Sequence, residues 1–163
     1  MKTIIHDLGE SYEALLKDKC DHIICADGRY APCQGCFGCW TKHPVQCHMK
    51  DSLQMVSRTL GRTKNLVIIT ENCYGAYSPA VKTILDRGIG ISTPFSTYRG
   101  KQMHHILRYG NHEKLTVYTY GDMTEEEENT FRYMVERTSI NNGFREFEFH
   151  VLSTLDELEG VAL

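Results

Sequence analysis

The sequence has little of several features that mark particular classes of protein. Only 4 of its 163 residues are proline and 41% are hydrophobic, a composition that argues against a collagen-like or disordered chain. No apolar run approaches the roughly 20 residues that a membrane-spanning helix needs, so no membrane partner is expected. Asp7 interrupts the N-terminal segment before the apolar core of a signal peptide can form. A cytoplasmic protein is therefore the working expectation.

Charge and short motifs exclude further classes. The formal net charge of −3 is not the basic balance of a nucleic-acid binder, and no nucleic-acid partner is expected. The sequence contains no G-x-S-x-G, H-E-x-x-H or P-loop motif, which removes the commonest hydrolase and nucleotide-triphosphatase interpretations. A length of 163 residues suits one domain that buries its own core, and a single domain over residues 1–163 is expected.

Cysteine, by contrast, is abundant and unevenly placed. Of the 7 cysteines, four form the pattern C-x2-C-x2-C-x7-C, namely Cys33, Cys36, Cys39 and Cys47. Three thiols at intervals of three residues can converge from one loop, as the ligands of an iron–sulfur cluster do. Zinc fits less well, because its cysteine sites usually use two separated pairs. Two other interpretations stay open: a redox-active thiol pair, and small buried residues that pack with their aromatic neighbours.

Short apolar strands alternate with amphipathic helices along most of the chain. Strands are expected over residues 2–7, 22–25, 65–70, 114–120 and 145–152, and helices over 12–17, 53–60, from 79, from 124 to about 139, and from 154. The alternation predicts a parallel sheet covered by helices on both faces. Ligands bind such sheets beyond the carboxyl ends of the strands. The loops that follow the strands, including the long irregular segment 29–50, are therefore the expected functional region, whereas the pattern makes no prediction for 88–113.

The loop after the strand 65–70 has the features of a ligand-binding turn. Tyr74 and Tyr77 offer flat apolar faces, and Gly75 and Ala76 let the backbone approach a ligand closely. The helix that follows begins with free N–H groups that can bind oxygen atoms. These properties suit a flat ring with polar edges, such as a flavin or a base. A plain strand-to-helix turn with tyrosines at the surface is the alternative interpretation.

Two motifs resemble those of a known family. The first runs from Pro32 to Pro44 with Cys47 and Asp51 beyond it, and the second runs from Tyr74 to Arg87. Together with the order of strands and helices, they resemble the flavodoxin-like NAD(P)H-dependent FMN reductases, a group that includes iron–sulfur flavoproteins. The resemblance implies a three-layer α/β sandwich whose five parallel strands lie in the order 2-1-3-4-5. It also implies bound FMN, electron transfer from NAD(P)H to a small acceptor, and a homodimer or a dimer of dimers.

The same resemblance implies which residues would bind the flavin. Its ring would lie between the loops that follow the third and fourth strands of the sheet, and its phosphate beside the loop after the first. The residues concerned are Gly9, Ser11, Asn72, Cys73, Tyr74, Gly75, Ala76, Tyr77, Tyr120, Gly121 and Asp122. No side chain is assigned a catalytic role, because the flavin itself would carry the redox chemistry.

The loop after the first strand departs from the family pattern. Family members have a loop there that is rich in Ser, Thr, Asn and Gly, whereas this chain places Asp7 and Glu10 beside Gly9 and Ser11. In water, the repulsion between a carboxylate and one unit of phosphate charge ~4 Å away weakens phosphate binding by about 1 kcal/mol. Two alternatives therefore stand beside the FMN oxidoreductase. One is an iron–sulfur flavoprotein with a [4Fe–4S] cluster on the four clustered cysteines, and the other is a non-catalytic module for binding or dimerisation.

Overall fold

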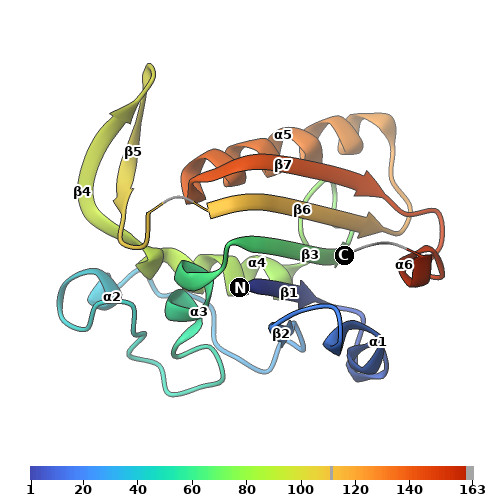
Figure 1. The fold of residues 1–163 in the computed structure, drawn as a ribbon, viewed down its shortest axis with the longest axis horizontal. Coiled ribbons are helices and arrows are strands. Elements are labelled where there is room, and N and C mark those ends of the chain that lie inside the picture. Colours follow the sequence, from blue (N-terminus) through green and yellow to red (C-terminus); the bar gives the residue numbers. More distant parts are fainter. Residues whose placement is uncertain (111, 161–163) are drawn as a thin grey trace.

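Five short apolar segments form a parallel sheet (Figure 1). The computed structural model describes residues 1–110 and 112–160. The strands of the sheet are β1 (Lys2–His6), β2 (His22–Cys25), β3 (Asn65–Glu71), β6 (His112–Tyr120) and β7 (Phe144–Val151). They lie in the order β2-β1-β3-β6-β7, and every neighbouring pair is parallel. Counted within the sheet this is the order 2-1-3-4-5, so the predicted flavodoxin-like α/β fold is confirmed.

Helices cover both faces of the sheet. They are η1 (Glu10–Tyr12), α1 (Glu13–Lys17), α2 (Gly38–Thr41), α3 (Val56–Arg62), α4 (Pro79–Arg87), η2 (Gly88–Ile91), α5 (Glu125–Asn142) and α6 (Glu157–Gly160). The side chains of α3, α4 and α5 pack into one apolar cluster, and those of α1 and α6 pack into another. Successive residues of β1 pack into opposite clusters, because strand side chains alternate between the two faces. Ile5 packs with α3, α4 and α5, and Ile4 packs with α1 and α6.

Two helices that start at the carboxyl edge of the sheet, α4 and α5, begin as the sequence signals predict. Ser78 caps α4 by accepting a hydrogen bond from the N–H of Val81, and Pro79 occupies the first helical position. Thr124 and Glu127 form a reciprocal capping box at the start of α5. Both helices therefore have well-defined starting points at the edge where ligands are expected to bind.

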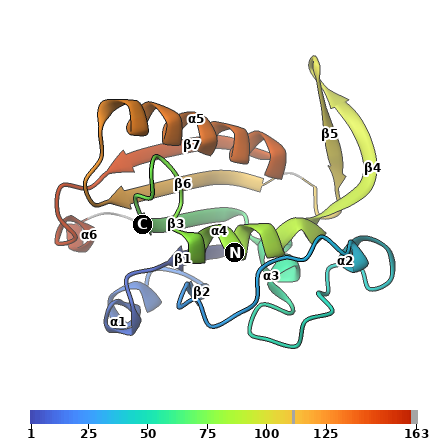
Figure 2. The ribbon, with the colours of Figure 1, turned by 180° about the vertical axis from the view of Figure 1, so that it is seen from behind.

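The segment for which the sequence pattern makes no prediction contains an antiparallel hairpin, β4 (Ser92–Arg99) and β5 (Gln102–Leu107). The hairpin stands out from the sheet near α2 and one end of α5 (Figure 2). Arg99 Nη1 donates to the carbonyl of Ile140 at 2.8 Å, and the His105 ring lies 4.7 Å from that of Trp40. Among the described residues, no helix is both long and apolar enough to cross a membrane.

Candidate functional site

One carboxylate joins the carboxyl ends of three strands. Asp7, directly after β1, accepts a hydrogen bond from the Glu71 N–H at 3.0 Å, from Thr70 Oγ1 at 3.0 Å and from the Tyr120 hydroxyl at 3.0 Å. The Thr70 oxygen in turn accepts a bond from the N–H of Ser78, which caps α4. These bonds connect β1, β3, β6 and the start of α4. No local pattern in the sequence predicted this structural role of Asp7, which was expected to repel a flavin phosphate.

Tyr120 has a side chain committed to this network. Burial raises the pKa of its phenol, and the nearby negative charge of Asp7 raises it further. The phenol is therefore a neutral hydrogen-bond donor throughout the neutral pH range, and it donates to Asp7. Tyr120 was expected to line a flavin ring, and in the structure its hydroxyl donates to Asp7.

Asn72 holds together the two loops that were expected to enclose such a ring. Its backbone N–H donates to the carbonyl of Tyr120 at 2.8 Å, and its Nδ2 donates to the carbonyl of Asp122 at 2.8 Å. Its Oδ1 accepts a bond from the N–H of Gly75 at 3.0 Å. The structure thus places the loop after β3 beside the loop after β6, which contains Gly121. The family resemblance implied this proximity.

An open hollow of about 370 Å³ lies at these loops. Its lining comes from the end of β3, the turn after it, the start of α4, the loop after β6 and the start of α5. The residues are Glu71, Asn72, Cys73, Tyr74, Ser78, Pro79, Asp122 and Glu127. Tyr74 is 89% exposed, and its φ of 54° lies in the left-handed region, which aromatic residues rarely adopt. Such a backbone costs about 1–3 kcal/mol and is typical of functional positions. The turn therefore presents one aromatic ring to solvent at the edge of the hollow.

The other residues of this turn face inward or are committed to internal bonds. Tyr77 is only 4% exposed, and its ring packs edge-on against Phe131, so it does not present a face to the hollow. Position 75 must be glycine because α5 packs closely against it: an added Cβ would lie 2.8 Å from the carbonyl oxygen of Glu127. The N–H of Cys73 bonds to Ala76 within the turn. Of the two tyrosines expected to stack, only Tyr74 is placed to do so.

The loop after β1 offers little to a phosphate group. Gly9, with a φ of 83°, and Ser11 are both exposed, and Ser11 lies within the single turn of η1. The loops after β1, β3 and β6 contain no Lys or Arg, while Asp7 and Glu10 both lie at the first. The ring end of a flavin therefore fits the residues present, and the phosphate end fits them poorly.

The clustered cysteines lie elsewhere in the fold. They line a small cavity of about 100 Å³ together with Arg87 and Ile89, at the end of α4 opposite to Ser78. Figure 1 shows the same separation, since α2 lies beside the hairpin, away from α1 and the strand arrowheads. Nine residues of α4 span about 13 Å at 1.5 Å per residue. The expectation that segment 29–50 belongs to the same edge as the other loops is wrong, because this segment crosses to the opposite end of the sheet.

An ion pair between a buried arginine and a partly buried aspartate anchors both ends of the cysteine loop. Arg87, whose side chain is 1% exposed, donates from Nη2 to Asp51 Oδ1 at 2.7 Å and from Nη1 to Asp51 Oδ2 at 2.8 Å. Arg87 Nη1 also donates to the carbonyl of Ala31 at 2.7 Å. The hydrogen bond with Arg87 lowers the pKa of Asp51 to about 2. Inside the loop, Phe37 and Val45 have positive φ angles of 54° and 64°, so the loop is held against ordinary backbone preference.

The sulfur atoms are spaced too widely for a single ion. In the part of the chain that the structure describes, no three of the four cysteines bring their sulfur atoms within 4.8 Å of one another. All four cysteines line one cavity, and burial together with the other three thiols raises the pKa of the Cys39 thiol. Zinc, whose ligand atoms lie about 2.0–2.3 Å from the ion, therefore fits this spacing poorly.

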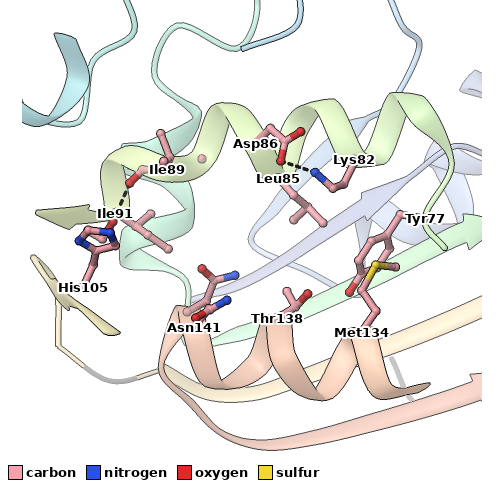
Figure 3. Close-up of a pocket in the computed structure, with 13 residues that line it drawn as sticks. Tyr77, Lys82, Leu85, Asp86, Ile89, Ile91, His105, Met134, Thr138 and Asn141 are labelled. Atoms are coloured by element: carbon pink, nitrogen blue, oxygen red, sulfur yellow. Dashed lines mark hydrogen bonds and ion pairs between the residues drawn. The ribbon is translucent and has the colours of Figure 1, made fainter. Parts of the chain in front are cut away.

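A larger groove of about 400 Å³ runs between α4 and α5, and the sequence did not predict it. Figure 3 shows Tyr77 and Met134 at one end of the groove and His105 of the hairpin at the other. An ion pair between Lys82 and Asp86 lies at its rim. Of the residues expected to bind FMN, only Tyr77 borders this groove. The groove and the hollow at the strand ends are therefore separate features.

Comparisons with known proteins bear on the fold. No family model matches the sequence, and no curated protein matches it. One similar solved structure is an NAD(P)H:quinone oxidoreductase from Methanothermobacter marburgensis, with a TM-score of 0.59 and 13% identity over 99% of this chain and 93% of that one. Another is an FMN-dependent NADH-azoreductase from Bacillus anthracis in complex with FMN, with a TM-score of 0.57 and 11% identity over 99% and 93%. At these identities the likeness establishes the flavodoxin-like fold.

The Asp51–Arg87 pair predicts a loss of stability in acid. The folded-state pKa of Asp51, about 2, lies below its ordinary value of 3.8. Its contribution is therefore complete above about pH 4 and is lost as the pH falls toward about 2. We expect Asp51→Asn to lower the free energy of unfolding at neutral pH and to make it less dependent on pH in this acid window. Urea unfolding across the pH range measures both effects, with the exposed Asp18→Asn as control. Parallel pH profiles for Asp51→Asn and the parent would contradict the assignment.

Proposed function

We propose that this protein is an FMN-binding oxidoreductase that passes electrons from NAD(P)H to a small acceptor. The observation that carries the proposal is the open hollow at the ends of β3 and β6, with the exposed ring of Tyr74 at its edge. In open parallel α/β sheets, ligands bind at the carboxyl ends of the strands. Solved structures that share the fold include proteins described as an NAD(P)H:quinone oxidoreductase and an FMN-dependent NADH-azoreductase.

The side chains of this protein would hold the flavin in place and would not take part as acids or bases. Tyr74 would stack on the flavin ring, and Asn72 would set the spacing between the loop after β3 and the residues Tyr120–Asp122. When bound, the flavin supplies the hydride and electron chemistry. The hollow is open to solvent, so NAD(P)H and the acceptor can reach the same face. Seven free cysteines suit the reducing environment of the cytoplasm, where we place the protein.

The proposal predicts that the purified protein binds FMN and that Tyr74→Ala weakens the binding. Loss of one aromatic stacking partner costs about 0.5–1.5 kcal/mol, or about two- to tenfold in affinity. Titration of FMN, followed by its fluorescence, measures the dissociation constant. Tyr133→Ala is the matched control, because Tyr133 is an exposed tyrosine on the outer part of α5, 62% accessible.

Failure of the parent protein to bind FMN would overturn the proposal. That result would favour the alternative of a non-catalytic module that keeps the fold for binding or dimerisation. The acidic loop with Asp7 and Glu10 is the feature that supports it. Binding that is equal in the parent and in Tyr74→Ala would instead place the flavin ring away from this turn.

A second candidate is an iron–sulfur flavoprotein that carries a [4Fe–4S] cluster. The convergence of four cysteines on one cavity supports it. The cavity belongs to a loop held firmly in place, since Arg87 anchors its ends and Trp40 Nε1 donates to the carbonyl of Ile89 at 2.9 Å. Such a cluster would be bound by the four thiolates, and its chemistry would be single-electron transfer.

The cluster hypothesis predicts iron and acid-labile sulfide in protein purified without oxygen. Cys33→Ser and Cys47→Ser should each remove most of the iron, whereas Cys20→Ser, at a half-buried cysteine outside the loop, should leave it unchanged. Iron and sulfide analysis of the four proteins provides the measurement. Iron-free parent protein, or equal iron in all variants, would show that the loop cysteines are not cluster ligands.

We also propose that the protein is a homodimer or a dimer of dimers. The β4–β5 hairpin supports this, because Phe95, Tyr98 and Met103 on it are 71%, 75% and 66% exposed. An isolated two-stranded hairpin is only marginally stable in water, so a partner that covers it would stabilise it. Tyr98 and Met103 are cross-strand partners and present one apolar face.

The dimer proposal predicts that the double substitution Tyr98→Ser, Met103→Ser shifts the protein toward a monomer. Light scattering coupled to size-exclusion chromatography gives the mass directly. Tyr133→Ser removes an aromatic residue that is also well exposed, at 62%, from α5 and should leave the mass unchanged. A monomeric parent, or a double variant that stays dimeric, would contradict a role for the hairpin.

A further inference from the structure

Three side chains with metal-binding groups meet at a place that the proposed function does not use. His6 ends β1 and Cys25 ends β2, and the two residues are direct partners in the parallel register. Their side chains therefore leave the same face of the sheet side by side. Glu13 begins α1, which covers this face by packing Leu16 into the same apolar cluster as Ile4. The tertiary fold thus brings three residues of different type and from different elements, His6, Glu13 and Cys25, to one place.

The donor atoms of this cluster lie close enough to share an ion. One ring nitrogen of His6, one carboxylate oxygen of Glu13 and the sulfur of Cys25 all lie within 4.8 Å of one another. Zinc binds such atoms at about 2.0–2.3 Å, so two ligands of one ion are at most about 4.6 Å apart. Small rotations of the side chains would complete the geometry.

The buried imidazole is an independent sign of a missing ligand. The His6 side chain is 0% exposed, and neither of its ring nitrogens has a hydrogen-bond partner within residues 1–110 and 112–160. Buried polar groups in proteins are nearly always paired, and an unpaired one costs about 1–3 kcal/mol. One of these nitrogens belongs to the cluster. A bound ion would pair it.

The local charge favours a cation. The carboxylates of Glu13, Asp27 and Glu10 all act electrostatically on the Cys25 thiol. A divalent ion would offset this concentration of negative charge. The donor types also narrow the choice of ion, since imidazole and thiolate prefer zinc-like transition metals, whereas magnesium and calcium take oxygen ligands.

We propose that His6, Glu13 and Cys25 bind one divalent transition-metal ion of the zinc type. Three protein ligands leave a fourth position of the tetrahedral ion free for water or another small ligand. Glu13 and Cys25 are half-buried, so that position faces the solvent side of the cluster. The site is separate from the cysteine loop and does not depend on flavin binding.

Cobalt(II) is a suitable probe, because thiolate ligands give it strong absorbance and tetrahedral sites intensify its visible bands. The test uses the full chain with Cys33, Cys36, Cys39 and Cys47 replaced by serine, which removes the competing thiols. We expect this protein to bind one equivalent of cobalt, which zinc displaces and magnesium does not. Cys25→Ser and Glu13→Gln in this background should weaken binding by about 100-fold or more, since even residues that only support metal ligands contribute 10–100-fold.

Matched controls separate this site from general effects on the fold. Cys20→Ser changes another half-buried cysteine, and Glu10→Gln removes a nearby carboxylate that is not a ligand. Both should retain cobalt within a few-fold of the parent affinity. If the four-serine protein does not fold, the zinc stoichiometry of the otherwise unaltered chain is compared between Cys25→Ser and Cys20→Ser, with a difference of one ion expected. Folded protein that binds no cobalt, or equal binding after Cys25→Ser, would overturn the proposal.

Discussion

The arrangement of the strand ends depends on the carboxylate of Asp7. It accepts hydrogen bonds from the chain at Thr70, Glu71 and Tyr120, and so fixes the ends of β1, β3 and β6 relative to one another. Hydrogen bonds to a charged group are worth about 1.5–3 kcal/mol each, more than bonds between neutral groups. The strained turn at Tyr74 starts from this rigid edge. The same charge that would repel a flavin phosphate is therefore needed to build the place where the flavin ring would bind.

Helix α4 runs from the hollow at the strand ends to the cavity of the cysteine loop, so its length sets the distance between these two candidate sites. Its N-cap, Ser78, belongs to the Asp7 network, while Arg87 in its last turn anchors the cysteine loop through Asp51 and Ala31. A buried ion pair of this kind contributes little net stability unless all its hydrogen bonds are made. Asp51 also accepts bonds from the backbone N–H groups of Ala31 and Leu53, whereas Arg87 Nε is buried without a hydrogen-bond partner among the described residues. The ion pair thus fixes the ends of a loop in which Phe37 and Val45 have positive φ angles.

Local patterns predicted the elements with strong signals. The buried strand β3 is apolar through its centre, and the capping residues of α4 and α5 are visible as Ser78-Pro79 and as the pair Thr124 and Glu127. The β4–β5 hairpin lacked such a signal, because its strands are largely exposed and do not alternate between a core and a solvent face. Its orientation depends on contacts with Trp40 and Ile140, which lie in other elements.

The sequence by itself determined the five strands of the parallel sheet, the main helices between them and the turn in which Tyr74 lies, because short-range spacing and capping encode them. The flavodoxin-like strand order was implied by the resemblance of two motifs to a known family. Only the tertiary structure decided what these residues contact. In the structure Tyr77 is buried in the core, and Gly75 packs against the backbone of α5. The cysteine loop lies at the C-terminal end of α4. The tertiary fold also brought His6, Glu13 and Cys25 together. Such contacts depend on strand register and helix packing between distant segments, which no local pattern specifies.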